Sequence, residues 1–128
     1  MNTYANPPTL AGPFGGYSHY CQIPAGSRLI QIAGQVGVAS DGTIPDDAER
    51  QCVLAFANLV AVLKHAQMDV GDITKMSVFL TDLSYIGAYR IAREGALGEL
   101  KPPNTLLVIP SLANPLWKVE IEAFAAKS

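Results

Sequence analysis

Two glutamates near the end of the chain have the side chains best suited to proton transfer. In the segment WKVEIEAFAA, residues 117–126, apolar residues alternate with Glu120 and Glu122. In an extended strand this alternation places both carboxylates on one face and Val119, Ile121 and Ala123 on the other. The pattern favours a solvated strand face. The alternative is a cleft carboxylate that holds a water or accepts a proton, a role that partial burial would assist by raising its pKa.

Asn104 is a second candidate. In the segment KPPNTLLVIP, residues 101–110, it follows two prolines at the point where a buried strand begins. It shares a strand face with Leu106 and Val108, so one amide lies among apolar neighbours. The simpler interpretation is a turn or capping residue after proline, and the alternative is a hydrogen-bond donor to a bound ligand.

The remaining polar candidates carry weaker signals. Arg90 and Arg93 lie beside the apolar stripe of a predicted helix, so we expect them at its edge or in solvent. Cys21 and Cys52 are interpreted as reduced packing residues, and the alternative for Cys21 is activation by His19 on the same strand face. The Cys and His spacings match no metal-ligand set and no cofactor motif is present, so we expect neither a metal nor a cofactor.

The composition predicts one small domain that associates with itself. The 128 residues are 49% hydrophobic and 16% charged, which leaves few polar side chains to cover a surface. The net charge of −2, the sequence pI of about 5.5 and the lack of Lys/Arg clusters argue against a nucleic-acid partner. No apolar run approaches the ~18 residues of a membrane span and no signal peptide is recognisable, so we expect a cytoplasmic protein without membrane contact.

The hydrophobic patterns and turn residues predict the element order β-β-α-β-α-β-β after an extended leader, residues 1–16. The first two strands are expected to form a hairpin closed by the turn at residues 24–27. The result is an α+β domain, residues 1–128, with two helices on one face of a mixed sheet and association through the uncovered face. The expected strands are 17–23, 28–38, 74–82, 104–112 and 117–126, and the expected helices are 45–66 and 83–97.

Three segments, residues 17–38, 56–83 and 117–125, together resemble the Rid family, also called YjgF or endoribonuclease L-PSP. The most specific matches are the GQVG strand end (34–37), DITKMSVFLTD (72–82) and VEIEA (119–123). The resemblance covers about Gly12 to Ala126. It implies a chorismate-mutase-like domain that assembles as a homotrimer with its sheets facing inward and clefts between subunits. Characterised members hydrolyse reactive enamines and imines to a keto acid and ammonia without a cofactor.

The resemblance also assigns roles to residues. In the deaminases an arginine within a P-A-R-S pattern holds the substrate carboxylate, and Asn104 stands at the matching position here. A glutamate on the last strand, which positions the attacking water, matches Glu120. The family's cleft tyrosine corresponds to Tyr17, and Gly34 is expected to border the substrate. Where deaminases tend to carry an asparagine this chain has Arg90, which leads to the hypothesis that Arg90 supplies the anchoring charge from another direction.

Two functions remain open from the sequence. One is an enamine/imine deaminase whose substrate range is altered by Asn104. The other is a non-catalytic protein that holds a small carboxylate or carbonyl metabolite in the same cleft. A ribonuclease or translation inhibitor, as the older family name suggests, fits poorly with an acidic chain that has no basic patch.

Overall fold

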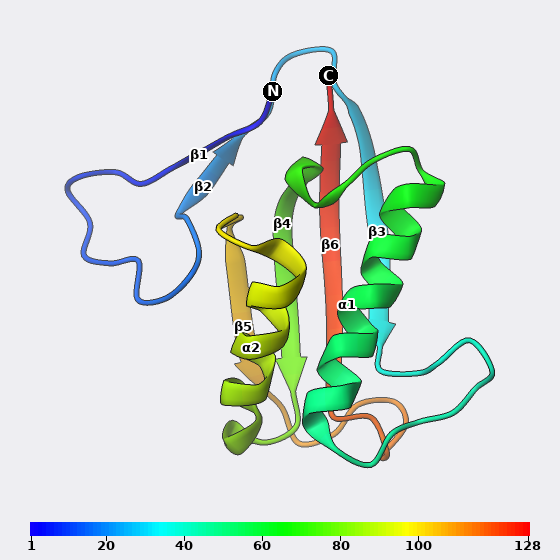
Figure 1. The fold of residues 1–128 in the computed structure, drawn as a ribbon. Coiled ribbons are helices and arrows are strands. Elements are labelled where there is room, and N and C mark those ends of the chain that lie inside the picture. Colours follow the sequence, from blue (N-terminus) through cyan, green and yellow to red (C-terminus); the bar gives the residue numbers. More distant parts are fainter.

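The computed structural model describes residues 1–128 and has two main layers, a four-stranded sheet and a pair of helices on one of its faces (Figure 1). This is the α+β architecture predicted from the sequence. The elements are β1 (Thr3–Ala5), β2 (Tyr20–Gln22), β3 (Arg28–Val36), α1 (Ala48–His65), η1 (Val70–Asp72), β4 (Ile73–Leu80), η2 (Leu83–Tyr85), α2 (Ile86–Leu97), β5 (Asn104–Val108) and β6 (Val119–Lys127).

The main sheet has the strand order β3-β6-β4-β5. β6 is antiparallel to β3 and to β4, and β4 is parallel to β5, so the sheet is mixed. The buried residues of β6, Val119, Ile121 and Ala123, face the helices, which confirms the predicted alternation. No helix covers the opposite face of the sheet (Figure 1).

The predicted hairpin between residues 17–23 and 28–38 is wrong. The turn does form, since the Ser27 hydroxyl donates to the Pro24 carbonyl at 2.6 Å, but β2 pairs with β1 and β3 pairs with β6. A turn signal specifies a reversal of the chain and not the partner of the strand that follows. The nine-residue β3 aligns with the nine-residue β6, whereas β2 has three residues. β1, the strand that pairs with β2, lies in the leader, where no strand was expected.

Helix α1 forms the centre of the core. Asp47 caps its first turn by accepting a hydrogen bond from the Arg50 amide at 2.6 Å. One face of the helix is fully buried against the sheet, as its apolar spacing predicts. Cys52 lies on that face, and burial raises the pKa of its thiol to about 11, so it is a packing residue. Neither helix has the combination of length and hydropathy needed to cross a bilayer.

Gln51 joins the two loops at one end of the sheet. Its side chain is fully buried, and Nε2 donates to the carbonyls of Pro45 (2.8 Å) and Leu116 (3.0 Å). Its Oε1 accepts from the Lys118 amide at 2.8 Å. Gly37 is required nearby, because a Cβ there would lie 2.5 Å from the Gln51 Cα. Gln51 therefore fixes the loop that precedes β6 and, through it, the start of that strand.

We predict that Gln51→Met lowers the free energy of unfolding by about 3 kcal/mol, because the thioether fills similar space but leaves three part-buried backbone groups without their partners. Urea denaturation measures the change. Gln22→Ala, at an exposed position of β2, is the matched control and is expected to change stability by less than about 0.5 kcal/mol. Equal stability of Gln51→Met and the native protein would contradict the role given to Gln51.

Candidate functional site

A cleft of about 340 Å³ lies where α2, β5 and the segment before β2 meet. Three of the predicted substrate-binding residues, Tyr17, Arg90 and Asn104, line it together although they are distant in sequence. The full lining comprises Phe14, Gly15, Gly16, Tyr17, Ile86, Tyr89, Arg90, Arg93, Asn104, Thr105 and Leu106.

Asn104 is the first residue of β5 and stands in register with Met76 of β4. Met76 is buried in the core, so the Asn104 side chain lies on the helix-covered face of the sheet. Its Nδ2 donates to the Tyr89 hydroxyl at 3.3 Å, while its Oδ1 is buried without a hydrogen-bond partner. The side chain therefore caps no backbone group, and one of its amide atoms has no hydrogen-bond partner within the chain.

Tyr89 supports Asn104 from behind. It is 1% exposed and stacks on Phe56 of α1 with ring centroids 5.8 Å apart. Burial raises the pKa of Tyr89 to about 12, so its hydroxyl is neutral at ordinary pH. The apolar stripe on the helix identified Tyr89 as a core residue, but its contact with Asn104 depends on how α2 crosses the sheet and could not be derived from spacing alone.

Arg93 was expected at the helix edge or in solvent, and it lies half-buried at that edge, where it lines the cleft. Its Nη1 donates to the Gly16 carbonyl at 3.0 Å, and a Cβ at position 16 would overlap the guanidinium group. Glycine at this position thus lets the leader approach α2. Arg90, three residues earlier on the helix, is exposed and lines the same cleft. No acidic residue of the same chain lines the cleft, so its two guanidinium groups give it a positive charge that would suit an anion.

Glu120 and Gly34 lie next to each other, but within one chain they are distant from this cleft. Glu120 lies in register with Phe79 of β4 and with Val36 of β3, on the helix-free face. A Cβ at position 34 would overlap its carboxylate, so the backbone of β3 and Glu120 pack closely. β4 separates β6 from β5, which puts Glu120 about 10 Å from β5 and on the face opposite to Asn104.

The Cys21 and His19 pair lacks the features of an activated thiol. Burial raises the pKa of Cys21, which disfavours the thiolate. His19 packs edge-on against Tyr17 with ring centroids 6.0 Å apart, and its Nε2 is buried without a partner. No group of three or more His, Cys, Asp or Glu side chains is arranged to hold a metal ion.

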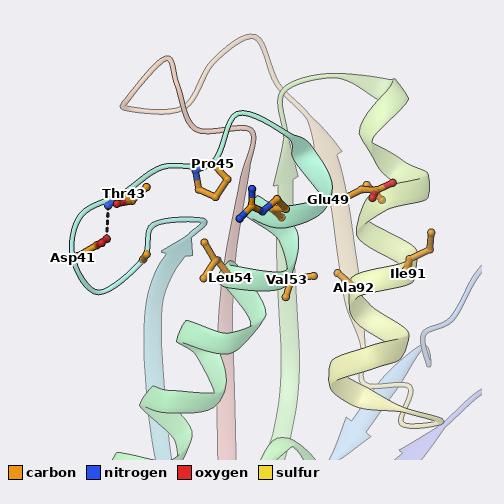
Figure 2. Close-up of a pocket in the computed structure, with 11 residues that line it drawn as sticks. Asp41, Thr43, Pro45, Glu49, Val53, Leu54, Ile91 and Ala92 are labelled. Carbon is orange, nitrogen blue, oxygen red and sulfur yellow. Dashed lines mark hydrogen bonds between the residues drawn. The ribbon is translucent and has the colours of Figure 1, made fainter.

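A larger hollow on the outer surface of the helices contains none of the predicted site residues. It has a volume of about 620 Å³ between the loop after β3 and the two helices, and Val53, Leu54, Ile91 and Ala92 form its apolar walls (Figure 2). At its rim the Asp41 carboxylate accepts the Thr43 amide at 2.9 Å, so this carboxylate already has a protein partner (Figure 2). The smaller cleft, with its unpaired amide atom and two guanidinium groups, is the better candidate for chemistry.

Comparison with known proteins agrees with the fold. Residues 9–127 match the family described as Endoribonuclease L-PSP. TdcF of Escherichia coli, provisionally named a reactive intermediate deaminase, is 32% identical over 118 residues, which cover 89% of this chain and 91% of TdcF. The 2-iminobutanoate/2-iminopropanoate deaminase of Escherichia coli is 29% identical over 126 residues, 95% of this chain and 93% of the enzyme.

Solved structures also superpose on this chain over most of its length. A Rid-family protein of unknown function, YyfB from Yersinia pestis, superposes with a TM-score of 0.86 at 26% identity and covers 98% of both chains. Escherichia coli TdcF with bound serine superposes with a TM-score of 0.75 at 31% identity, covering 91% of this chain and 92% of TdcF.

We predict that Tyr89→Phe destabilises the protein by about 1 to 2 kcal/mol at neutral pH, because it leaves the Asn104 amide without its acceptor. Urea denaturation is the measurement. Tyr85→Phe is the matched control, since the Tyr85 ring packs beneath the Lys118 ammonium and its hydroxyl has no hydrogen bond in the structure. Equal effects of the two substitutions would show that the Tyr89 hydroxyl does not hold Asn104.

The pH dependence of stability gives a further test of Tyr89. The Tyr89 hydroxyl loses its proton near pH 10 in the unfolded chain and near pH 12 in the folded chain. The stability that the raised pKa gives the folded state is therefore complete below pH 10 and is lost as the pH rises towards 12. The native free energy of unfolding should fall about 2 to 3 kcal/mol more than that of Tyr89→Phe across this interval. Parallel curves for the two proteins would contradict the raised pKa.

Proposed function

Because the chain belongs to the Rid family, described also as endoribonuclease L-PSP, we propose that it is an enamine/imine deaminase that converts a small anionic imine to a keto acid and ammonia. The observation that carries the proposal is the cleft in which Tyr17, Arg90 and Asn104 meet beside Arg93. Two relatives are named for this chemistry, and the residues of the cleft suit a small carboxylate.

The reaction assigns a task to each group. An enamine first tautomerises to its imine, and water then adds to the C=N carbon to give a carbinolamine. Glu120 takes a proton from the attacking water and passes it to nitrogen, which gives the carbinolamine. It then takes the hydroxyl proton of the carbinolamine and passes it to nitrogen, so that a C=O bond forms as the C–N bond breaks and ammonia leaves. The arginines hold the substrate carboxylate, and Asn104 donates to or accepts from a polar group of the substrate.

This mechanism requires a second copy of the chain, because the proposed base and the proposed substrate-binding residues must meet. Glu120 and Asn104 lie on opposite faces of one sheet, so a neighbouring subunit must bring its Glu120 to the cleft. The helix-free face has apolar side chains suited to such packing, since Leu29 is 66% exposed, Leu107 49% and Phe124 45%. A homotrimer packed through these faces, with one cleft at each subunit boundary, is the assembly that we propose.

The second candidate function is a non-catalytic protein that binds a small carboxylate metabolite in the same cleft. The observation in its favour is Asn104 itself, because a neutral amide replaces the charged fork that the deaminases carry at the matching position. Loss of such a contact removes about 2 kcal/mol or more of binding or transition-state stabilisation.

The test is ammonia release from 2-aminoacrylate generated in place by a serine dehydratase. We expect release by the native protein above the rate of spontaneous hydrolysis, and at least about a hundredfold loss in Glu120→Gln. Glu122→Gln, two residues along the same strand face, is the matched control and should keep native activity. An active Glu120→Gln protein would remove the proposed base.

Asn104→Arg separates the two candidate functions. If the native protein is a deaminase that holds the substrate carboxylate weakly, Asn104→Arg restores the guanidinium group at this position and should release ammonia about tenfold faster. If ammonia is released from 2-aminoacrylate only at the spontaneous rate with both the native protein and Asn104→Arg, the binding-protein function is favoured instead.

A further inference from the structure

We propose that the groove between the outer surfaces of α1 and α2 binds an amphipathic helix of a partner protein. The groove joins the hollow of Figure 2 to a second hollow of about 800 Å³, and Val53, Ile91 and Ala92 line both. It shares no lining residue with the candidate cleft, so this interaction goes beyond the proposed function.

The outer side of α1 lacks the polar residues of an ordinary surface helix. A helix that packs one side on a sheet normally carries charged residues on the other side, and a helix that is apolar all round is normally buried. Residues 51–63 contain no charged side chain, and the two polar ones, Gln51 and Asn58, donate to backbone carbonyls of the chain. Val53 is nevertheless 58% exposed, and Ala57 is exposed with it. The outer side of α1 therefore has the composition of an interface.

The facing wall of α2 continues this apolar surface. Ile91 is 68% exposed, and Ala88, Gly95 and Ala96 line the groove beside it. The charged side chains of α2 line neither hollow. Small residues on this wall leave space between the helices for the side chains of another element.

The length and walls of the groove suit a helix. It follows α1 from Glu49 to Lys64, which is about 22 Å at 1.5 Å per residue and equals a helix of about 15 residues. Both walls are helices whose backbone groups bond within the helix. An extended peptide between them would leave its own N–H and C=O groups without partners, whereas a helix satisfies those groups internally.

Charges at the two ends of the groove set the direction of the partner. Asp41, Glu49 and Arg50 line one end, two carboxylates against one guanidinium, and Lys64 lines the other, with no charged side chain between. Both helices run in the same direction, with their N-termini at the end that has the carboxylates (Figure 1). An antiparallel third helix aligns favourably with their macrodipoles. Acidic residues in its first turn would meet Lys64, and basic residues in its last turn would meet the carboxylates.

Fluorescence anisotropy of a labelled 15-residue peptide tests the inference. The peptide has leucines on one helical face, glutamates in its first turn, lysines in its last turn, and alanine and glutamine elsewhere. The control peptide has the same composition with its leucines spread around the helix. We expect the native protein to bind the first peptide at least about tenfold more tightly. Equal affinity for the two peptides would overturn the proposal.

A substitution locates the peptide in the groove. Ile91→Glu should weaken its binding at least about tenfold, because the partner would bury an unpaired charge. Leu83→Glu is the matched control, since Leu83 is 69% exposed on η2 outside the groove, and it should bind the peptide like the native protein. Equal losses in the two variants would contradict a site in the groove.

Reversal of one charge tests the direction of the helix. Lys64→Glu should weaken binding of the peptide about threefold, and should strengthen by a similar factor a second peptide whose terminal charges are exchanged. The same response of both peptides would contradict the antiparallel arrangement.

Native mass spectrometry separates a partner protein from a second copy of this chain. In the proposed trimer the helix layers face outward, so pairing through the grooves would link trimers into a cage or an open network. We expect the native protein and Ile91→Glu to form assemblies of the same mass. A larger assembly of the native protein that Ile91→Glu abolishes would assign the groove to a second copy and overturn the proposal.

Discussion

The alternation of side chains along neighbouring strands is the constraint on which the proposed site depends. β5 stands in register with β4, and β4 with β6, so the direction of each side chain follows from its partner. Asn104 is paired with Met76 in the core and Glu120 with Phe79 on the helix-free face. A shift of one residue in either register would reverse this assignment. The anion cleft and the proposed base therefore cannot meet within one chain, and catalysis by both would require association of subunits.

In the proposed function the positive charge of the cleft comes from a different element than the family resemblance implies. An arginine on the penultimate strand is absent, and arginines from α2 occupy the space beside Asn104. The structure allows this arrangement because Gly16 lets the leader approach Arg93 closely, and because Tyr89 fills the core behind Asn104. A fork that approaches from the helix meets a ligand at a different angle from one that extends along the sheet, which is a physical basis for altered specificity.

Features with a regular period were predictable from the sequence, and features that depend on contacts between distant segments were not. The buried face of α1 and the alternation of β6 follow from periods of 3.6 and 2 residues. The predicted hairpin was wrong because β2 pairs with β1, which lies in a leader that is rich in proline and glycine. Tyr17, Arg90 and Asn104 were identified through family resemblance, whereas the bond from Arg93 to Gly16 joins positions 77 residues apart and has no local signal.

The most direct test of the account is complementation between two inactive variants. Glu120→Gln subunits and Arg90→Gln/Arg93→Gln subunits would be unfolded, mixed in equal amounts and refolded, and ammonia release from 2-aminoacrylate measured. If each site takes its glutamate from one subunit and its arginines from the next, random mixing restores both in about a quarter of the sites, and activity returns to about that fraction of the native value. Activity no greater than that of the separate variants would contradict a site shared between subunits.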